Sequence, residues 1–342
     1  MATMQDVARH AGVSLSTVSY VINKTRPISD ATRARVEAAM AELGYRRNAA
    51  ARSLASKRSR TIALVLPSTE NALGGTLSEI VTQAARAARA RDNHVAVWPG
   101  LGSEEQDAAE IHDLVLEGAV DGVVFLEVSL DDARVATLEK VDVPFVTLGR
   151  PARTEGRACV DIDFDAAVDE AVALLAAEGH RQIGFVNHSE ASQRRGYGPS
   201  VRAEAAFATA TRAHGVVGTH VWADEEAAGG RGALDALLGA APAPTAVVLM
   251  NETAGFGLLA QARRRGLDVP ADLSVLAIAT SRGVGALAEP QLTSLEVPAE
   301  RLARHAVETL LDLVEGREAP SEPILVPCAL APGDSVAPPR DR

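Results

Sequence analysis

Apolar residues in the first 45 positions recur every three to four residues, which is the spacing of one helix face. One such pattern begins at Thr3, a second at Ser14, and a third starts after Ser29 and ends at Gly44. Thr3 and Ser14 are good helix N-caps, because their hydroxyls can accept hydrogen bonds from free backbone N–H groups. Gly12, between the first two patterns, tolerates the positive φ of a tight turn. The segment is therefore predicted to form a helix-turn-helix braced by a third helix.

The rest of the chain alternates short, nearly continuous apolar runs with amphipathic stretches of helical length. The predicted strands are residues 62–67, 95–98, 122–127, 144–149, 182–186, 246–250 and 274–279. The predicted helices include residues 103–117, 163–178, 201–213, 252–265 and 299–315. This alternation is typical of parallel sheets covered on both faces. It predicts an α/β core of two doubly wound subdomains, with a ligand site in the cleft beyond the carboxyl ends of the strands.

Charge is distributed unevenly between these two regions. Residues 1–60 hold eleven lysines and arginines against four acidic residues, so this segment carries a charge of +7. The remainder carries −18, which gives the chain its net charge of −11. A basic head on an acidic body is typical of a nucleic-acid-binding domain joined to a regulatory domain. The distribution favours DNA binding over the alternative of an ordinary three-helix domain.

The second predicted helix is the one expected to enter the major groove of DNA. Its apolar stripe, formed by Val18, Val21 and Ile22, faces the inside of the head. Short polar side chains at the start of such a helix can approach base edges, and backbone N–H groups there can meet phosphate. The residues expected on or near the outer face are Leu15, Ser16, Thr17, Ser19 and Tyr20.

The segment DVARHAGVSLSTVSYVINKTRPISDATRARVEAAMAELGYRRNAAARSL resembles the head of the LacI/GalR family of bacterial repressors. The resemblance implies that three residues distinguish one operator from another, namely Leu15, Ser16 and Tyr20. It implies that other residues hold the DNA backbone or frame the base contacts. The other DNA-binding residues predicted for the head are Thr3, Gln5, Ser14, Thr17, Asn23 and Arg26.

Residues 48–55 (NAAARSLA) resemble the hinge helix of the same family. Alanine favours a helix, but a segment this short is not stable alone. The resemblance implies that the hinge folds on the operator and that Leu54, with Ala55 beside it, meets the minor groove at the dyad. An apolar wedge of this kind unstacks a base step and kinks the duplex. The alternative is that Leu54 packs within a linker.

The phrases DGVVFLE, EGHRQIGFV, VPADLSVLAIA and PQLTSLEVP resemble the regulatory core of the family, which is similar to periplasmic sugar-binding proteins. The resemblance implies a small-molecule effector in the cleft, such as a sugar or a nucleoside. The effector-binding residues predicted by this resemblance are Arg202 and Asn251.

The predicted pocket departs from the family pattern in several places. Residues 71–77 contain no aromatic side chain that could cover a ligand, and the place of the family's pocket arginine falls on Ala203, next to Arg202. The Asn-Asp pair of the family is Asn251-Glu252 here, and Ala279 replaces an aspartate that often follows the last core strand. These changes disfavour an ordinary sugar, because a sugar needs buried polar partners. A regulator that has lost its effector response is the alternative.

Other protein classes fit the sequence less well. No catalytic, cofactor or metal-ligand spacing occurs, so the chain is predicted to be no enzyme and to need no cofactor or metal. No apolar run could cross a bilayer, and no secretory signal starts the chain. These features disfavour a periplasmic solute-binding protein and predict a cytoplasmic location without a membrane partner. The last residues lack leucine heptads, so a homodimer on near-palindromic double-stranded operator DNA is expected.

The predicted domain organisation has three parts. Residues 1–46 form the DNA-binding domain, residues 47–58 the hinge helix and linker, and residues 59–342 the effector-binding and dimerisation core. Within the core, the first subdomain is expected at residues 59–156 and 290–317. The second subdomain is expected at residues 157–289 and 318–331.

Overall fold

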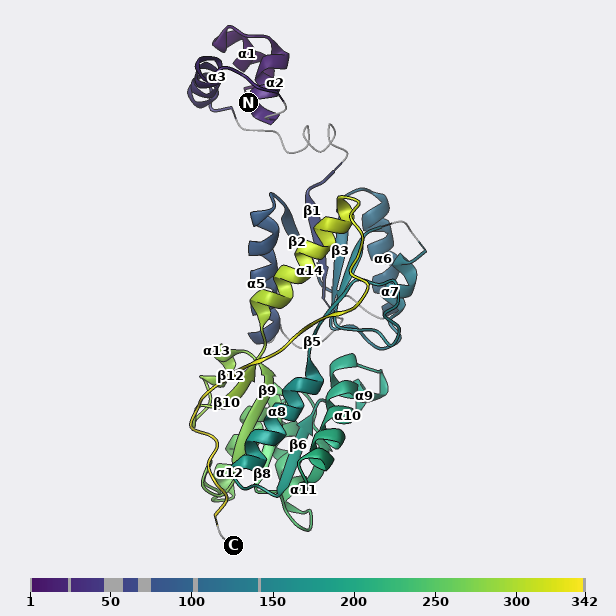
Figure 1. Cartoon of the computed structure of the whole chain (residues 1–342), viewed down its shortest axis with the longest axis vertical. Coiled ribbons are helices and arrows are strands. Elements are labelled where there is room, and N and C mark those ends of the chain that lie inside the picture. Colours follow the sequence, from purple (N-terminus) through teal and green to yellow (C-terminus); the bar gives the residue numbers. More distant parts are fainter. Residues whose placement is uncertain are drawn as a thin grey trace. The chain divides into compact units, whose positions relative to one another are not determined.

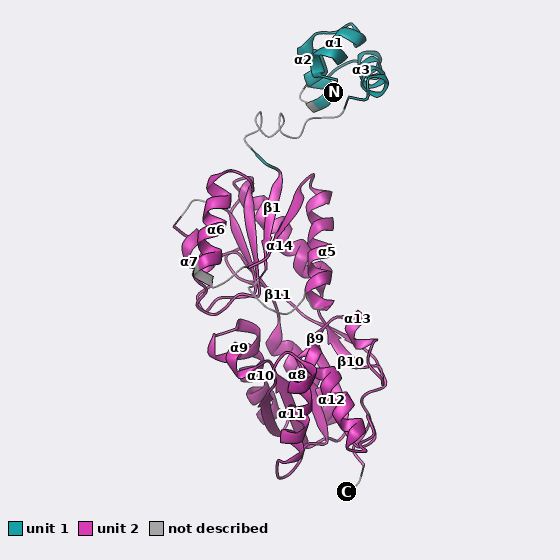
Figure 2. Cartoon of the chain, turned by 180° about the vertical axis from the view of Figure 1, so that it is seen from behind, with its two compact units in different colours: residues 1–59 teal, residues 60–342 magenta. Residues whose placement is uncertain are grey.

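The chain divides into two compact units, residues 1–59 and residues 60–342, which we call the head and the body (Figure 2). The computed structural model describes residues 2–23, 26–45, 58–66, 75–100, 104–140 and 143–340.

The described part of the head consists of three helices, as the spacing predicts. They are α1 (Met4–Ala11), α2 (Leu15–Asn23) and α3 (Asp30–Glu42). Each helix contributes a fully buried valine to one small core, namely Val7, Val18 and Val36. The chain leaves α3 through Gly44, whose φ of 60° is a left-handed conformation that suits glycine.

Among the described residues, the body contains two six-stranded sheets, ordered β11-β5-β4-β3-β1-β2 and β12-β10-β9-β8-β6-β7. The strands of the first sheet are β1 (Thr61–Val65), β2 (His94–Trp98), β3 (Gly122–Leu126), β4 (Phe145–Leu148), β5 (Cys159–Ile162) and β11 (Ile324–Val326). Those of the second are β6 (Gln182–Asn187), β7 (Val217–Trp222), β8 (Ala246–Leu249), β9 (Ser274–Thr280), β10 (Thr293–Glu296) and β12 (Ala329–Ala331). All neighbouring strands are parallel except β10 and β12. The predicted doubly wound α/β core is confirmed.

Helices cover both faces of each sheet (Figure 1). Those of the first subdomain are α5 (Gly75–Ala90), α6 (Glu104–Leu116), α7 (Ala133–Leu138) and α14 (Ala299–Val314). Those of the second are α8 (Phe164–Ala177), α9 (Glu190–Arg194), α10 (Gly198–Ala213), α11 (Ala227–Leu238), α12 (Glu252–Arg264) and α13 (Arg282–Gly285). One apolar core under α5, α14, α8 and α10 runs through both subdomains.

The chain crosses between the two sheets at other points than the sequence predicts. β5 follows the predicted boundary at residue 157 but still joins the first sheet, so the crossing comes after Ile162. β10 belongs to the second sheet, whereas α14 returns to the first. β11 then pairs with β5 in the first sheet before β12 ends in the second. These predictions were wrong because an apolar run reveals that a strand is buried but not which of two similar sheets buries it.

Segments from the end of the chain fasten the second subdomain. Ser335, fully buried, donates its hydroxyl to the carbonyl of Val275 and accepts from the backbone N–H of Thr293. The buried His180 ring bonds Thr245 through Nδ1, and its Nε2 lies 3.0 Å from the carbonyl oxygen of Ala337. Residues 335–337 are therefore part of the fold of the second subdomain.

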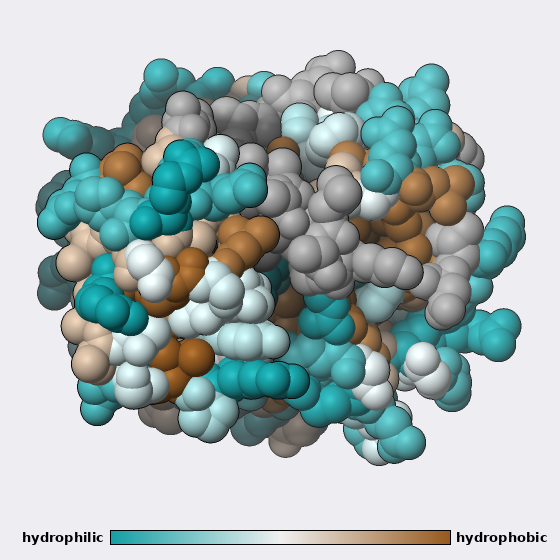
Figure 3. All heavy atoms as spheres, turned by 90° about the horizontal axis from the view of Figure 1, so that it is seen from above, coloured by the Kyte–Doolittle hydropathy of each residue, from teal (hydrophilic) through white to brown (hydrophobic). Residues whose placement is uncertain are grey.

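Figure 3 shows one face of the molecule, on which hydrophilic side chains surround separate apolar patches. Within the part of the chain that the structure describes, no helix is long and apolar enough to cross a membrane.

Candidate DNA interface and ligand cleft

Local hydrogen bonds fix the start of α1 and the turn that follows it. The backbone N–H of Asp6 donates to Thr3 Oγ1 (3.3 Å), and the backbone N–H of Thr3 donates to Asp6 Oδ2 (2.9 Å). The reciprocal pair is a capping box, and it confirms Thr3 as the predicted N-cap. The hydrogen bonds from Thr3 hold the pKa of Asp6 below its ordinary value. Gly12 then turns the chain with a φ of 63°, as predicted.

A hydroxyl cluster caps the start of α2. The backbone N–H of Thr17 donates to Ser14 Oγ (3.1 Å), so Ser14 is the predicted cap. Ser14 Oγ also lies 2.8 Å from the hydroxyl oxygens of Ser16 and Thr17. Ser14 thus orients the hydroxyls of Ser16 and Thr17, which are both predicted to contact DNA.

Several of the residues predicted to contact DNA are exposed on the head. Leu15, at the first turn of α2, is 48% exposed although it is apolar, and Ser16 beside it is exposed. Tyr20 is half-buried one turn further along. The remaining predicted contacts fall as follows: Thr3, Gln5, Ser14 and Arg26 are exposed, Thr17 is half-buried, and Asn23 is the last residue of α2. Leu54 and Ala55 lie outside the described residues, so the hinge helix stays a prediction.

In the body, the two subdomains meet at loops that follow the carboxyl ends of strands. Beyond β3, the backbone N–H of Leu130 donates to the carbonyl of Gly196 (2.8 Å), which precedes α10. The N–H of Gly198 donates to the carbonyl of Val128 (3.3 Å). A Cβ at Gly198 would come 2.5 Å from Nη1 of Arg202 and 3.0 Å from that same carbonyl oxygen, so a larger residue here would force Arg202 to move.

A second contact between the subdomains is centred on Glu252, at the start of α12. Its Oε1 accepts from the hydroxyl of Thr280 (2.8 Å) and from the backbone N–H of Ser281 (3.0 Å). The hydroxyl of Thr76, on α5 in the first subdomain, donates to the same oxygen. One carboxylate therefore joins three segments. Sequence analysis missed this role, because nothing in the spacing of these residues relates positions 76, 252 and 280.

Arg202 reaches from α10 to the first subdomain. Its Nη2 donates to the carbonyls of Arg150 (2.6 Å) and Pro151 (3.3 Å), while its buried Nη1 has no hydrogen-bond partner. Burial lowers the pKa of the guanidinium. Ala203, where the family pattern places its pocket arginine, is instead fully buried in the apolar core. Arg202 is thus the residue of this pair that lies where the two subdomains meet and keeps an unpartnered donor.

Asn251 has a structural role in α12. Its Oδ1 accepts from the backbone N–H of Ala254 (3.0 Å), which makes it the N-cap, and its Nδ2 donates to the carbonyl of Ala223 (2.9 Å). The residue is 1% exposed. Since its amide is used within the protein, Asn251 has less to offer a ligand than Arg202 does.

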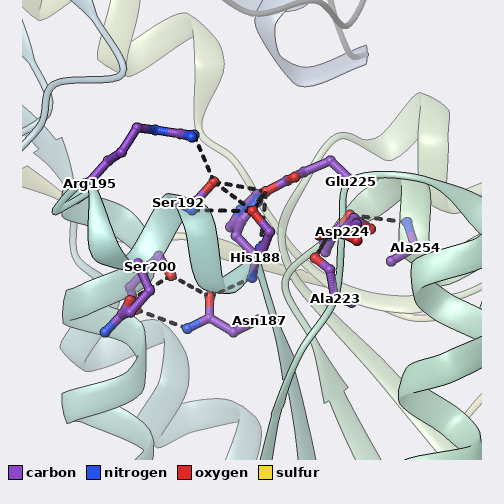
Figure 4. Close-up of polar contacts among 12 residues, drawn as sticks. Asn187, His188, Ser192, Arg195, Ser200, Ala223, Asp224, Glu225 and Ala254 are labelled. Carbon is purple, nitrogen blue, oxygen red and sulfur yellow. Dashed lines mark hydrogen bonds and ion pairs between the residues drawn. The ribbon is translucent and has the colours of Figure 1, made fainter.

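A polar cluster near the end of β6 surrounds Glu225 (Figure 4). Glu225 Oε1 accepts from the backbone N–H of Ser189 (3.1 Å) and from the hydroxyl of Ser192 (3.1 Å), and it lies 3.4 Å from Nδ1 of His188. Burial alone would raise the pKa of Glu225, but the hydrogen bonds from His188 and Ser189 outweigh it and lower the pKa to about 2. The carboxylate is held charged and in place.

Glu127 and Tyr197 extend this cluster toward the first subdomain. Glu127 follows β3 with a φ of 51°, a left-handed conformation that is uncommon outside glycine and is concentrated at functional sites. Among the described residues, its carboxylate has no hydrogen-bond partner, and burial raises its pKa. Burial also raises the pKa of Tyr197, as do the carboxylates of Glu127, Asp161 and Glu225. The sequence offers one sign of this site, an acid that ends the apolar run DGVVFLE.

Across the described residues, no group of three or more histidine, cysteine, aspartate or glutamate side chains could hold a metal ion.

Two family models match the chain. Residues 3–48 match the bacterial regulatory proteins of the lacI family, and residues 172–336 match a periplasmic binding protein-like domain. Catabolite control protein A of Priestia megaterium is 31% identical over 279 residues, covering 79% of this chain and 80% of that protein. The HTH-type transcriptional repressor PurR of Erwinia tasmaniensis is 31% identical over 343 residues, covering 98% of this chain and 97% of that protein. The chain belongs to the LacI family.

Solved structures of LacI-family proteins share the whole fold. The lac repressor dimer bound to operator and the anti-inducer ONPF is 26% identical, with a TM-score of 0.81, and the match covers 98% of this chain and 99% of that one. The transcriptional regulator CelR in complex with cellobiose is 27% identical with a TM-score of 0.72, covering 98% of this chain and 100% of that one. The LacI family consists of DNA-binding transcriptional regulators, and the resemblance stated from the sequence is confirmed.

Proposed function

We propose that the protein is a transcriptional repressor that binds a near-palindromic operator as a homodimer and responds to a small molecule in the cleft between its subdomains. The observation that carries the proposal is the outer side of α2, where Leu15 and Ser16 are exposed beside Tyr20. A LacI-family head that presents these side chains on its second helix is built to read the major groove. The charge of +7 on residues 1–60 supports attraction to DNA phosphate.

Binding-site selection from random DNA with the full-length chain tests operator recognition. The expected result is a near-palindromic motif, and simultaneous replacement of Leu15, Ser16 and Tyr20 should redirect it. If the wild-type chain enriches no motif, sequence-specific binding is refuted. If the triple variant selects the same motif, α2 is not the reading helix.

The hinge proposal rests on the family resemblance and has its own test. We expect Leu54→Ala to weaken operator binding more than binding to unrelated DNA, because a minor-groove wedge acts only at the dyad of the operator. Both titrations must be run at one salt concentration, since phosphate contacts make affinity salt-dependent. An equal loss on both DNAs would remove the wedge role.

The proposed homodimer finds support in a shallow groove on the second subdomain. Its apolar part includes Phe256, 40% exposed, and Leu287, 75% exposed, while Arg263 and Glu289 lie along the same groove. Apolar side chains flanked by both charge signs suit a self-complementary contact with a second copy. Leu287→Glu should convert dimers to monomers in sedimentation equilibrium, whereas Leu116→Glu, on another exposed leucine, should not. Unchanged dimers would place the interface elsewhere.

Effector control is supported by the free groups at the cleft, a buried unpartnered Nη1 on Arg202 and an unpartnered carboxylate on Glu127. A thermal-shift screen of sugars, nucleosides and purine bases is expected to find a stabilising ligand, since a ligand that binds only the folded state raises the melting temperature. Arg202→Ala should remove that stabilisation. A chain that binds its operator but is stabilised by none of these ligands would favour the alternative, a regulator without effector response.

A further inference from the structure

Polar side chains from both subdomains meet beyond the carboxyl ends of the strands. Glu127 follows β3 in the first subdomain. In the second, His188 follows β6, Glu225 follows β7 and Tyr197 precedes α10. The backbone brings the two sides together, because Ser129 and Tyr197 form an antiparallel bridge. The rings of His188 and Tyr197 then meet edge to face, with their centres 5.3 Å apart.

The polar atoms left without a partner in this cluster are mainly hydrogen-bond acceptors. Glu225 makes the contacts described above through Oε1, and no other described residue hydrogen-bonds its Oε2. Nδ1 of His188 faces that Oε1, which leaves Nε2 of the neutral ring as an acceptor. No described residue hydrogen-bonds the carboxylate of Glu127 either. A ligand that fits here must therefore supply donors.

The cluster also carries negative charge that the nearby guanidinium groups do not balance. Arg134 is bound to both carboxylate oxygens of the buried Asp132 (2.9 and 2.7 Å). Burial lowers the pKa of Arg202, and the opposing charge is that of Asp161 rather than that of Glu127. Burial raises the pKa of Glu127, which is the response of a carboxylate without a close counter-charge.

We infer that the effector carries a protonated amino group and that the carboxylates of Glu127 and Glu225 bind it. The inference rests on the proposed function, because it takes the cleft to be the effector site. An ammonium group supplies three donors, no acceptor and one positive charge, so it matches both the free acceptors and the unbalanced charge. A sugar hydroxyl supplies no charge. The ligand class is an organic amine, either an amino sugar or a linear polyamine.

Titration calorimetry of the full-length chain with matched compounds tests the class of ligand. Glucose has a hydroxyl in place of the amino group of glucosamine, and it should bind at least roughly 10-fold more weakly, the effect of a hydrogen bond to a charged group. N-acetylglucosamine keeps the nitrogen without its charge and should bind as weakly as glucose. Binding of putrescine but not of glucosamine would identify a polyamine. Binding of glucose as tight as that of the better amine, or binding of neither amine, would overturn the inference.

Substitution of the carboxylates tests the residues. Glu127→Gln keeps the shape of the side chain and removes its charge, so it should weaken amine binding at least roughly 10-fold. Glu225→Gln should have the same effect. Glu117→Gln is the matched control, since Glu117 is exposed between α6 and β3, near the opposite end of the strand that Glu127 follows. Amine binding that is equal in Glu127→Gln and Glu117→Gln would remove Glu127 from the site.

The ligand-free chain gives a measurement that does not depend on the choice of compound. Glu127→Gln should raise the melting temperature of the body by roughly 2 °C, because it removes a half-buried charge that has no counter-charge. A lower melting temperature would show that the protein itself uses this charge, and would overturn the inference. Operator selection separates the inference from the function beneath it. A chain that binds amines but selects no motif would refute the regulator, whereas a chain that selects a motif but binds no amine would refute only the ligand class.

Discussion

The head and the body use their polar side chains in opposite ways. The caps of the head join residues three positions apart at the surface, such as Thr3 with Asp6 and Ser14 with Thr17. The contacts between the subdomains of the body join residues that are far apart in sequence, such as Thr76 with Glu252 and Arg202 with Arg150. The head thus keeps its outer side for a partner, whereas the body uses buried polar groups to hold its own two halves together. A substitution should therefore affect contact with DNA in one region and internal coupling in the other.

The largest expected effect comes from breaking the core of the head. Val18→Asp places a carboxylate where the side chain is fully buried, and a small domain has only a few kcal/mol with which to offset it. Operator affinity should fall at least about 100-fold, the equivalent of roughly 3 kcal/mol. The main melting transition, which reports the body, should not move. A shift in that transition would show that the two regions are not independent.

Removing the carboxylate at the cleft should have the next largest effect. Glu252→Ala leaves three donors without their acceptor and should lower the free energy of unfolding of the body by about 1–3 kcal/mol in urea. Glu190→Ala is the control, because this exposed glutamate makes only a 3.9 Å ion pair with Arg194. Equal stability of the two variants would mean that the contact through Glu252 does not couple the subdomains.

Acid should weaken the body through its buried histidine. Burial lowers the pKa of His180, so below pH 6.5 the unfolded chain takes up a proton that the folded chain resists. The free energy of unfolding should then fall with pH, by at most about 1.4 kcal/mol per pH unit for this group. Urea unfolding at pH 7.5, 6.5 and 5.5 measures the slope, which His180→Gln should reduce. The pKa of Glu225 is lowered to about 2, so this group changes the free energy of unfolding only below pH 4.5, outside the pH range measured. An unchanged slope in the variant would assign the acid sensitivity to other groups.

The smallest effect is expected at a cap outside the DNA-contacting set. Ser29 Oγ accepts from the backbone N–H of Thr32 at the start of α3. Ser29→Ala should destabilise the head by about 1 kcal/mol, which faster hydrogen exchange of the α3 amides would report. Operator affinity should change little, because the folded state still predominates. A large loss of affinity would place Ser29 in the DNA interface.

The sequence predicted the three helices of the head, because their determinants are local. The Thr3 and Ser14 caps, the turn at Gly12 and the buried stripe of Val18 follow from residues within one or two helical turns. The doubly wound fold of the body was also predictable from its apolar runs. The sheet that each of the short strands β5, β10 and β11 joins was not, because that choice depends on contacts far along the chain.

The roles of single residues where the subdomains meet could not be predicted from the sequence either. Arg202 was identified only through the family resemblance. Its Nη2 is bound by the carbonyls of Arg150 and Pro151 and its Nη1 has no partner, which depends on the position of a segment about 50 residues away. The joining role of Glu252 leaves no local pattern that could have indicated it, and Glu127 leaves only one local sign, the acid that ends the run DGVVFLE. Polar contacts between distant segments are decided by packing, so they become visible only in three dimensions.

The alternation of the last two strands between the sheets has a consequence for folding kinetics. β11 and β12 are outer strands of the first and second sheets, and only residues 327 and 328 separate them in sequence. β11 pairs with β5 and β12 pairs with β10, so each strand joins a segment much earlier in the sequence. Contacts between such distant segments form late, because the loop-closure entropy must be lost first. One short segment therefore couples the completion of both sheets.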